Sequence, residues 1–106
     1  MKTIGTIQAY GQTLELKQGT YRGRNGAIAI SLTGTDEDGF PAPYGALTVS
    51  IPGVQLAKDE ILVKTWGENE EFRTPALTSG LFQDTGRRVP TGFVAAEVWK
   101  LTGVLQ

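Results

Sequence analysis

Short apolar runs, most of them alternating with polar residues and closed by turn-forming residues, recur along the whole chain. In residues 13–17 two leucines face one way while Thr, Glu and Lys face the other, which is the period of a half-buried strand. Asn25-Gly26 suits the type I′ turn of a β-hairpin, and Pro52-Gly53 suits a type II turn. The pattern predicts a mainly β fold.

Two stretches between the apolar runs, residues 33–43 and 84–92, are expected to be loops because glycine, proline and polar residues dominate them. The last strand is expected to expose Glu97 and Lys100. The six predicted strands cover residues 3–10, 13–17, 27–32, 44–51, 61–66 and 93–101.

One short helical insert is predicted near residues 69–80. Pro75 opposes a continuous helix there, because proline lacks a backbone donor and clashes with the preceding turn. The better division takes Thr74 as the N-cap, Pro75 as the first helical residue and Gly80 as the stop.

Six strands and one helical insert predict a small barrel or a two-sheet sandwich, formed by a single domain over residues 1–106. We prefer the barrel, because closure removes the open strand edges that a sheet otherwise presents. An α+β arrangement is the alternative if the helical region is longer than expected.

Histidine and cysteine are both absent from the 106 residues. Histidine is the side chain that changes charge most readily near neutral pH, and with cysteine it provides most zinc ligands. Their absence excludes Ser-His and Cys-His nucleophile pairs, thiol redox chemistry and disulfides. We therefore expect no catalytic residues, no metal site and no cofactor, and a protein that is not an enzyme. An enzyme that uses two carboxylates is the remaining catalytic alternative.

The net charge is −1, from 10 basic and 11 acidic side chains. Proteins that hold nucleic acid through phosphate contacts usually carry a basic excess, so nucleic acid is not the favoured partner. The N-terminus lacks the apolar run of a signal peptide, and no apolar stretch approaches the roughly 20 residues that span a bilayer. A cytoplasmic location without membrane attachment is expected.

Two acidic segments are candidate binding sites. The first is Asp36-Glu37-Asp38, whose spacing resembles the start of a calcium loop, but the following residues supply no further oxygen ligands. A solvated charged loop is the other interpretation. The second acidic segment contains Glu68, Glu70 and Glu71. Acidic residues at a helix start are also explained by the helix dipole alone.

Two aromatic residues lie close to the acidic segments in the sequence. Phe40 stands in the expected loop, where it either folds back over the core or projects as a binding anchor. Trp66 ends a predicted strand, so packing at the core or its rim is the alternative to ligand contact.

Arginines form the other candidate site. Tyr21, Arg22 and Arg24 surround the predicted hairpin turn, and Arg87 and Arg88 lie in the second expected loop. Two arginine pairs beside an aromatic ring can grip a phosphate or stack on a base. Their ordinary role would be to shield sheet edges and keep the surface soluble.

Residues 59–70 (DEILVKTWGENE) and 84–101 (DTGRRVPTGFVAAEVWKL) resemble a family of small proteins encoded on bacterial phages and other mobile elements, with a fainter similarity over 46–56. The family has no assigned activity, so no functional residue is transferred. The resemblance implies a setting, that of a small accessory protein of a mobile genome. Proteins of that kind often block a host or defence component.

The leading hypothesis is a non-enzymatic module that binds a protein partner, such as an inhibitor of a bacterial host or defence protein. Its anchors would be Phe40 and Trp66, and its acidic groups would steer the encounter or imitate nucleic-acid phosphates. The alternative is a small nucleotide- or nucleic-acid-binding β-barrel. A homo-oligomer formed through an open strand edge is a further alternative. The acidic groups of the leading hypothesis are Asp36, Glu37, Asp38, Glu68, Glu70 and Glu71, and the anion-binding alternative uses Tyr21, Arg22, Arg24, Arg87 and Arg88.

Overall fold

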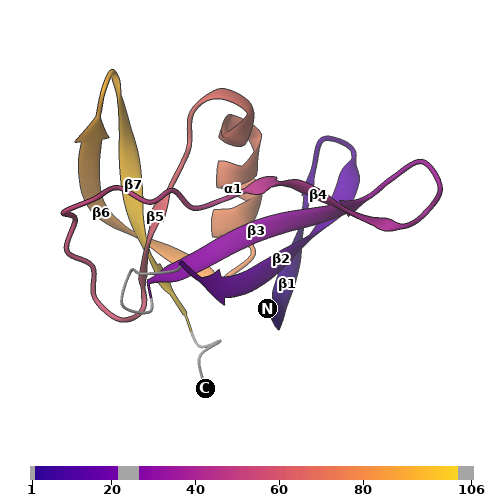
Figure 1. Ribbon diagram of the computed structural model, residues 1–106, viewed down its shortest axis with the longest axis horizontal. Coiled ribbons are helices and arrows are strands. Elements are labelled where there is room, and N and C mark those ends of the chain that lie inside the picture. Colours follow the sequence, from indigo (N-terminus) through magenta and orange to yellow (C-terminus); the bar gives the residue numbers. More distant parts are fainter. Residues whose placement is uncertain (1, 22–26, 103–106) are drawn as a thin grey trace.

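The computed structural model describes residues 2–21 and 27–102. Within these ranges the chain forms seven strands, one short 3-10 helix and one α-helix (Figure 1). The elements are β1 (Lys2–Ala9), β2 (Gln12–Thr20), β3 (Ile28–Thr35), β4 (Pro41–Ala46), β5 (Glu60–Val63), η1 (Gly67–Asn69), α1 (Glu70–Thr78), β6 (Phe82–Thr91) and β7 (Val94–Leu101).

The strands form two antiparallel sheets, one in the order β1-β2-β3-β4 and the other in the order β5-β7-β6. In Figure 1 the β3–β4 hairpin points to one side, and the β6–β7 hairpin stands at the opposite side. Helix α1 contacts β1 of the first sheet and β6 of the second. The mainly β prediction with one short helix is confirmed, but the described residues form no closed barrel.

A short extended segment after β4 joins the two sheets. Leu47 donates its N–H to the carbonyl of Ile30 at 2.9 Å and accepts from Lys64 N–H, also at 2.9 Å. Thr48 forms an isolated bridge with Val63 of β5. The single strand predicted over 44–51 is therefore divided, because its second half leaves the first sheet to pair with the second.

The core lies between the inner faces of the sheets and is covered by α1. Leu14 and Leu16 of β2 are fully buried, as the alternation in their strand predicts. The opposite face of the second sheet has a smaller cluster of its own, covered by the chain that follows β4. The buried members of that cluster are Leu62, Ala96 and Val98, and Val49, Ile51, Val54, Leu56, Trp66 and Val89 pack against them.

Helix α1 begins earlier than predicted, so that Pro75 lies inside it and Thr74 is not its N-cap. Phe72 and Ala76 lie four residues apart on one helical face, and both are buried in the main core. Burial of this face compensates for the hydrogen bond that proline removes.

Both expected loops are largely strand. Strand β3 continues to Thr35 and β4 begins at Pro41, so only residues 36–40 form a turn. Residues 84–92 belong mostly to β6, whose pairing with β7 is irregular between Asp84 and Arg88. Proline is tolerated on edge strands and glycine in bulges, so their presence did not mean that residues 33–43 and 84–92 were loops.

The sheet edges are protected without closure. Pro41 and Pro43 on the edge strand β4 have no N–H to offer another strand, and Pro90 has the same effect on the edge strand β6. Strand β1, at the other edge of the first sheet, has an irregular register near Gly5. A barrel would have protected the edges by closure, whereas this chain relies on prolines and irregular pairing.

The strands on either side of the predicted Asn25-Gly26 turn pair with each other, as a hairpin requires. Strands β2 and β3 pair antiparallel up to Thr20 and Ile28, although the predicted turn residues Asn25 and Gly26 lie outside the described ranges. The turn between β1 and β2 falls at Tyr10 and Gly11, so the first strand ends one residue earlier than predicted.

Candidate functional site

Two tyrosines form a partly exposed aromatic pair over the end of Phe72. The ring of Tyr10 lies 5.9 Å from that of Tyr44 and 5.6 Å from that of Phe72, measured between centroids. Tyr10 is 42% exposed and Tyr44 is 39% exposed, whereas Phe72 is buried. The pair joins the β1–β2 turn to β4 and to α1.

The backbone of Tyr10 has a positive φ of 53°, and Gly11 follows with 75°. These two positive values are those of a type I′ turn, which asparagine and glycine adopt most easily. An aromatic residue in this conformation is strained. Its hydroxyl donates to the carbonyl of Glu68, so the ring is held at both ends.

Three glutamates lie near this pair, at the start of the helical segment. Glu68 lies in η1, and Glu70 and Glu71 occupy the first turn of α1. All three are exposed, and none forms an ion pair within residues 2–21 and 27–102. We call Tyr10, Tyr44, Glu68, Glu70 and Glu71 the acidic–aromatic surface.

Local contacts hold this surface in place. The side chain of Asn69 donates to the carbonyl of Ala46 at 2.6 Å, which fixes the start of α1 to the end of β4. Loss of water around the hydroxyl raises the pKa of Tyr10, and the nearby carboxylates of Glu71 and Glu68 raise it further. The glutamates therefore lie close enough to act on the tyrosine electrostatically.

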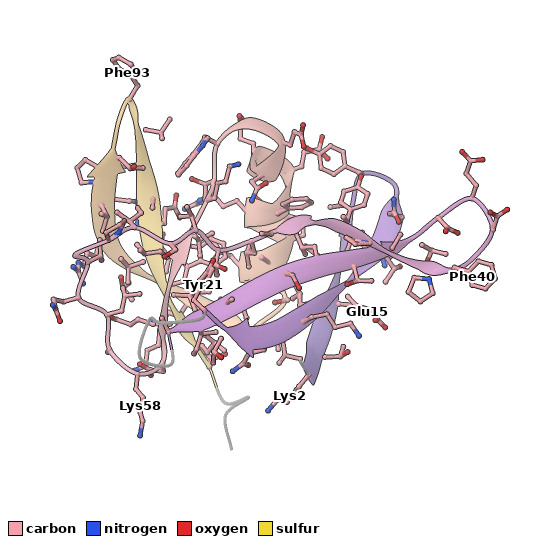
Figure 2. The ribbon with its side chains drawn as sticks, in the orientation of Figure 1. Lys2, Glu15, Tyr21, Phe40, Lys58 and Phe93 are labelled. Carbon is pink, nitrogen blue, oxygen red and sulfur yellow. The ribbon has the colours of Figure 1, made fainter. Side chains whose placement is uncertain are left out.

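The first acidic segment forms the tip of the β3–β4 hairpin. Asp36 shapes this tip, because its Oδ1 accepts the backbone N–H of both Asp38 and Phe40 at 2.9 Å. Glu37 and Asp38 are exposed. Phe40 is 66% exposed and projects at the far end of the molecule (Figure 2), so it does not fold back over the core.

The two acidic segments do not converge. Asn69 touches β4 at Ala46, while the tip with Asp36 and Phe40 adjoins its other end at Pro41. The 6 residues of β4 span about 17 Å at roughly 3.3 Å per residue. A contact that includes both segments must extend along the whole strand.

Trp66 lies apart from the aromatic pair. Its ring packs, partly buried, against the smaller cluster of the second sheet. The ammonium group of Lys64 lies 5.9 Å from the ring centroid. Phe40 and Trp66 are therefore not neighbours of one compact site.

Arg88 belongs to an ionic network rather than to an open anion site. Both of its terminal nitrogens donate to the carboxylate of Asp84 at 2.8 Å. Arg73 of α1 donates through Nε to both oxygens of Glu97 at 3.1 and 3.0 Å, and it also reaches Asp84 at 3.3 Å. Trp99 Nε1 donates to Glu97 at 2.9 Å. We call these five residues the ionic network.

The prediction that Glu97 is exposed is wrong. Only 8% of the residue is accessible, because the side chain points to the same side of β7 as the buried Trp99. The network balances two arginines against two acids and joins α1 to β6 and β7. These contacts give the residues of the ionic network a structural role, because they hold the helix against the two strands.

The remaining predicted anion-binding residues do not form one cluster in the described ranges. Arg87 donates to the carbonyl of Gln55 at 2.8 Å. The Tyr21 hydroxyl forms a hydrogen bond of 2.8 Å with Thr48 Oγ1. Arg22 and Arg24 lie outside the described residues.

A hollow of about 460 Å³ lies beside Tyr21, with walls of mostly apolar residues from the chain between β4 and β5. Among the residues that line the hollow, Glu60 carries the single carboxylate, which accepts a hydrogen bond from the N–H of Ala57 at 2.8 Å. No pair of carboxylates faces this hollow in the described part of the chain. No group of three acidic residues there is arranged to hold a metal ion, and none of its helices is long and apolar enough to cross a membrane.

The Asp84 interactions predict an acid-dependent loss of stability. The hydrogen bonds from Arg88 lower the pKa of Asp84, with further lowering by Gly86 N–H and Arg73. Asp84 therefore binds a proton more readily in the unfolded chain than in the folded protein. The stabilisation by its ionised carboxylate is fully present above the ordinary aspartate pKa and is lost as the pH falls through the lowered pKa of the folded protein. Urea unfolding between pH 7 and pH 2 should therefore show the stabilities of wild type and Asp84→Asn drawing together below about pH 4.

The Arg88→Gln variant is the matched control for this titration, since it removes the main cause of the lowered pKa. Its stability should depend less on pH over the acidic range than that of the wild type. Parallel pH profiles for wild type and Asp84→Asn would contradict the assignment.

Comparisons with known proteins add no relative to this description. No protein-family model matches the chain, and neither a curated protein nor a solved structure shows significant similarity to it. The resemblance to proteins of phages and mobile elements stays a prediction.

Sequence reasoning missed several residues that the structure brings forward. Tyr10 directly precedes a turn glycine, and an aromatic residue at that position was the available signal. Tyr44 carried no signal of its own, because its partner comes from another hairpin. Phe93 follows Gly92 in a second tight turn and was counted only as the start of a strand.

Proposed function

We propose that this protein is a non-enzymatic binding module that recognises a basic surface of a protein partner through the acidic–aromatic surface. The observation that carries the proposal is the exposed Tyr10–Tyr44 pair with three glutamates beside it that have no ion-pair partner in the described ranges. Fixed aromatic rings beside free carboxylates suit the recognition of arginine and lysine side chains.

The chemistry of such a contact follows from the two kinds of group. A guanidinium or ammonium ion is attracted to the face of a tyrosine ring and to a carboxylate. Glu68, Glu70 and Glu71 also create a negative field that accelerates the encounter with a positive partner. The unusual backbone of Tyr10 supports the proposal, since strain of this kind is found more often at functional positions.

A small module of this type fits the setting that the sequence resemblance implies. An accessory protein of a phage or mobile element can inhibit a host or defence protein by covering its basic surface. A set of carboxylates on a defined backbone can take the place of nucleic-acid phosphates on such a partner. The acidic tip at residues 36–38 and the exposed Phe40 would then add contacts along β4 at the rim of the interface.

The test uses substitutions that suit the backbone at each position. Tyr10→Asn keeps a residue that accepts positive φ, and Tyr44→Thr keeps a good strand former. Affinity capture from the organism that encodes the protein identifies the partner, and calorimetry with the purified partner measures the affinity. We expect the double variant to bind at least about tenfold more weakly, as the loss of interface anchors usually costs more than 1 kcal/mol.

Salt and charge provide the second readout. The association rate of the wild type should fall as salt rises from 50 to 500 mM, and Glu71→Lys should lower it at low salt. Glu15→Lys is the matched control, because Glu15 is an exposed acid of β2 that pairs with Lys17. Equal binding by the double variant and the wild type would refute the proposal.

A further inference from the structure

We propose that the tip of the β6–β7 hairpin is a second protein-binding anchor, in which Phe93 and Val94 enter a preformed apolar pocket of a protein partner. The inference does not depend on the acidic–aromatic surface. Phe93 and the Tyr10–Tyr44 pair belong to different hairpins, and the experiments that test them change different residues.

Phe93 is the most exposed large apolar residue among those described. It is 109% exposed, compared with 66% for Phe40 and 42% for Tyr10, and Val94 beside it is 36% exposed. Figure 2 shows the ring pointing away from the molecule at the end of the hairpin. The side chain buries no surface within the chain, so it contributes nothing to the core.

The turn itself does not require a phenylalanine. Gly92 has a positive φ of 66°, which suits the first central position of a type II′ hairpin turn. The second central position, held by Phe93, takes ordinary backbone angles and accepts small polar residues. An apolar residue at this place is therefore explained by something other than folding.

The hairpin holds the backbone that carries the ring in a defined position. Strands β6 and β7 pair at Thr91 with Val94, at Pro90 with Ala95 and at Val89 with Ala96. Below these pairs the ionic network ties both strands to α1. A rigid finger loses little conformational entropy when it binds, which favours affinity.

The composition of the finger indicates the chemistry of its partner. Residues 89–96 contain no charged side chain. The nearest charges, Arg88 and Glu97, are occupied within the ionic network. A finger without charges matches an uncharged apolar pocket, and it lacks the lysines and arginines that attach peripheral segments to anionic lipid.

The surface area of the tip favours binding to a pocket of another protein over binding to the tip of a second copy of the chain. Two fingers that meet tip to tip bury little more than Phe93 and Val94 on each side, far below the roughly 800 Å² per partner of a stable interface. A cleft that encloses the hairpin also contacts the exposed Pro90 and Ala95, so it covers more of the finger than a second tip does.

Site-specific cross-linking tests the proposal. The photoreactive residue p-benzoylphenylalanine replaces Phe93 in the full chain, which is expressed in the organism that encodes it, and the same residue at Gln83, an exposed position near the other end of β6, is the matched control. We expect the residue at 93 to form an adduct with one protein, mapped by mass spectrometry to peptides that line an apolar pocket. With that purified protein, Phe93→Ser should raise the Kd by about tenfold or more and Gln83→Ser by less than about threefold.

Folding is monitored separately, and Phe93→Ser should keep the melting temperature of the wild type because the ring is not buried. Adducts only with another copy of the chain, together with a Phe93-dependent dimer in sedimentation equilibrium, would overturn the proposal. Flotation with phosphatidylglycerol vesicles that is lost in Phe93→Ser would also overturn it, in favour of a lipid surface. So would the absence of any adduct at 93, or a Kd that Phe93→Ser leaves unchanged.

Discussion

Replacing Phe72 with alanine is expected to lower the free energy of unfolding by about 3–5 kcal/mol, the usual range for a large buried aromatic residue. Phe72 is only 2% exposed, and the centroid of its ring lies 5.6 Å from that of Tyr10 and 6.2 Å from that of Tyr44. The substitution leaves a cavity under α1 and removes the support of both tyrosines. Urea unfolding followed by tryptophan fluorescence measures the change.

Phe40→Ala is the matched control for this prediction, because the same side chain is lost from an exposed hairpin tip. Its free energy of unfolding should stay within about 0.5 kcal/mol of the wild type. A Phe72→Ala variant as stable as the Phe40→Ala variant would show that α1 does not pack on the sheets as described. If the acidic–aromatic surface binds the partner, Phe72→Ala should also weaken binding in the fraction that stays folded.

Replacing Glu97 with alanine should lower the free energy of unfolding by about 2–4 kcal/mol, since Arg73 and Trp99 then lose a hydrogen-bond acceptor in a mostly buried environment. The side chain of Glu97 is 11% exposed, and it accepts from Arg73 Nε and from Trp99 Nε1. The indole N–H is buried, so it cannot turn to water. The partial exposure of Arg73 keeps the expected loss below that of a fully enclosed ion pair.

Lys100→Ala tests whether any ion pair would give the same result. Lys100 lies 3.7 Å from Asp59, and its side chain is 53% exposed. Exposed pairs of this kind contribute at most about 1 kcal/mol. Thermal unfolding followed by circular dichroism should separate the two variants clearly, and a small loss in both would contradict the structural importance of the ionic network.

Much of the strand content was predictable because its signals are local. The alternation in residues 13–17 predicted the middle of β2, and the strands predicted over 27–32, 61–66 and 93–101 overlap β3, β5 and β7. Strand β6 was missed because a bulge around Gly86 and a proline make an irregular edge strand resemble a loop. The predicted helix was too short because the rule that places proline at the first position of a helix does not consider the burial of one helical face.

The candidate site was predictable only in part. Glu70 and Glu71 lie in the first turn of α1, where the helix dipole favours them, although the preferred division began the helix only after Thr74. Their aromatic neighbours were not foreseen, because Tyr10 reaches Glu68 from 58 positions away. The anion-binding alternative used Arg88 as a ligand, whereas its guanidinium pairs with Asp84 across the irregular part of β6.

The sequence by itself determined that short strands and tight turns dominate this chain, since alternation and turn chemistry act between close neighbours. It also determined that histidine and cysteine chemistry is absent. Only the tertiary structure decided that two sheets are joined through residues 47–49 and that Glu97 is buried against Arg73, 24 positions away. The physical reason is that burial and ion pairing depend on where separate elements meet in space, which no single stretch of residues specifies.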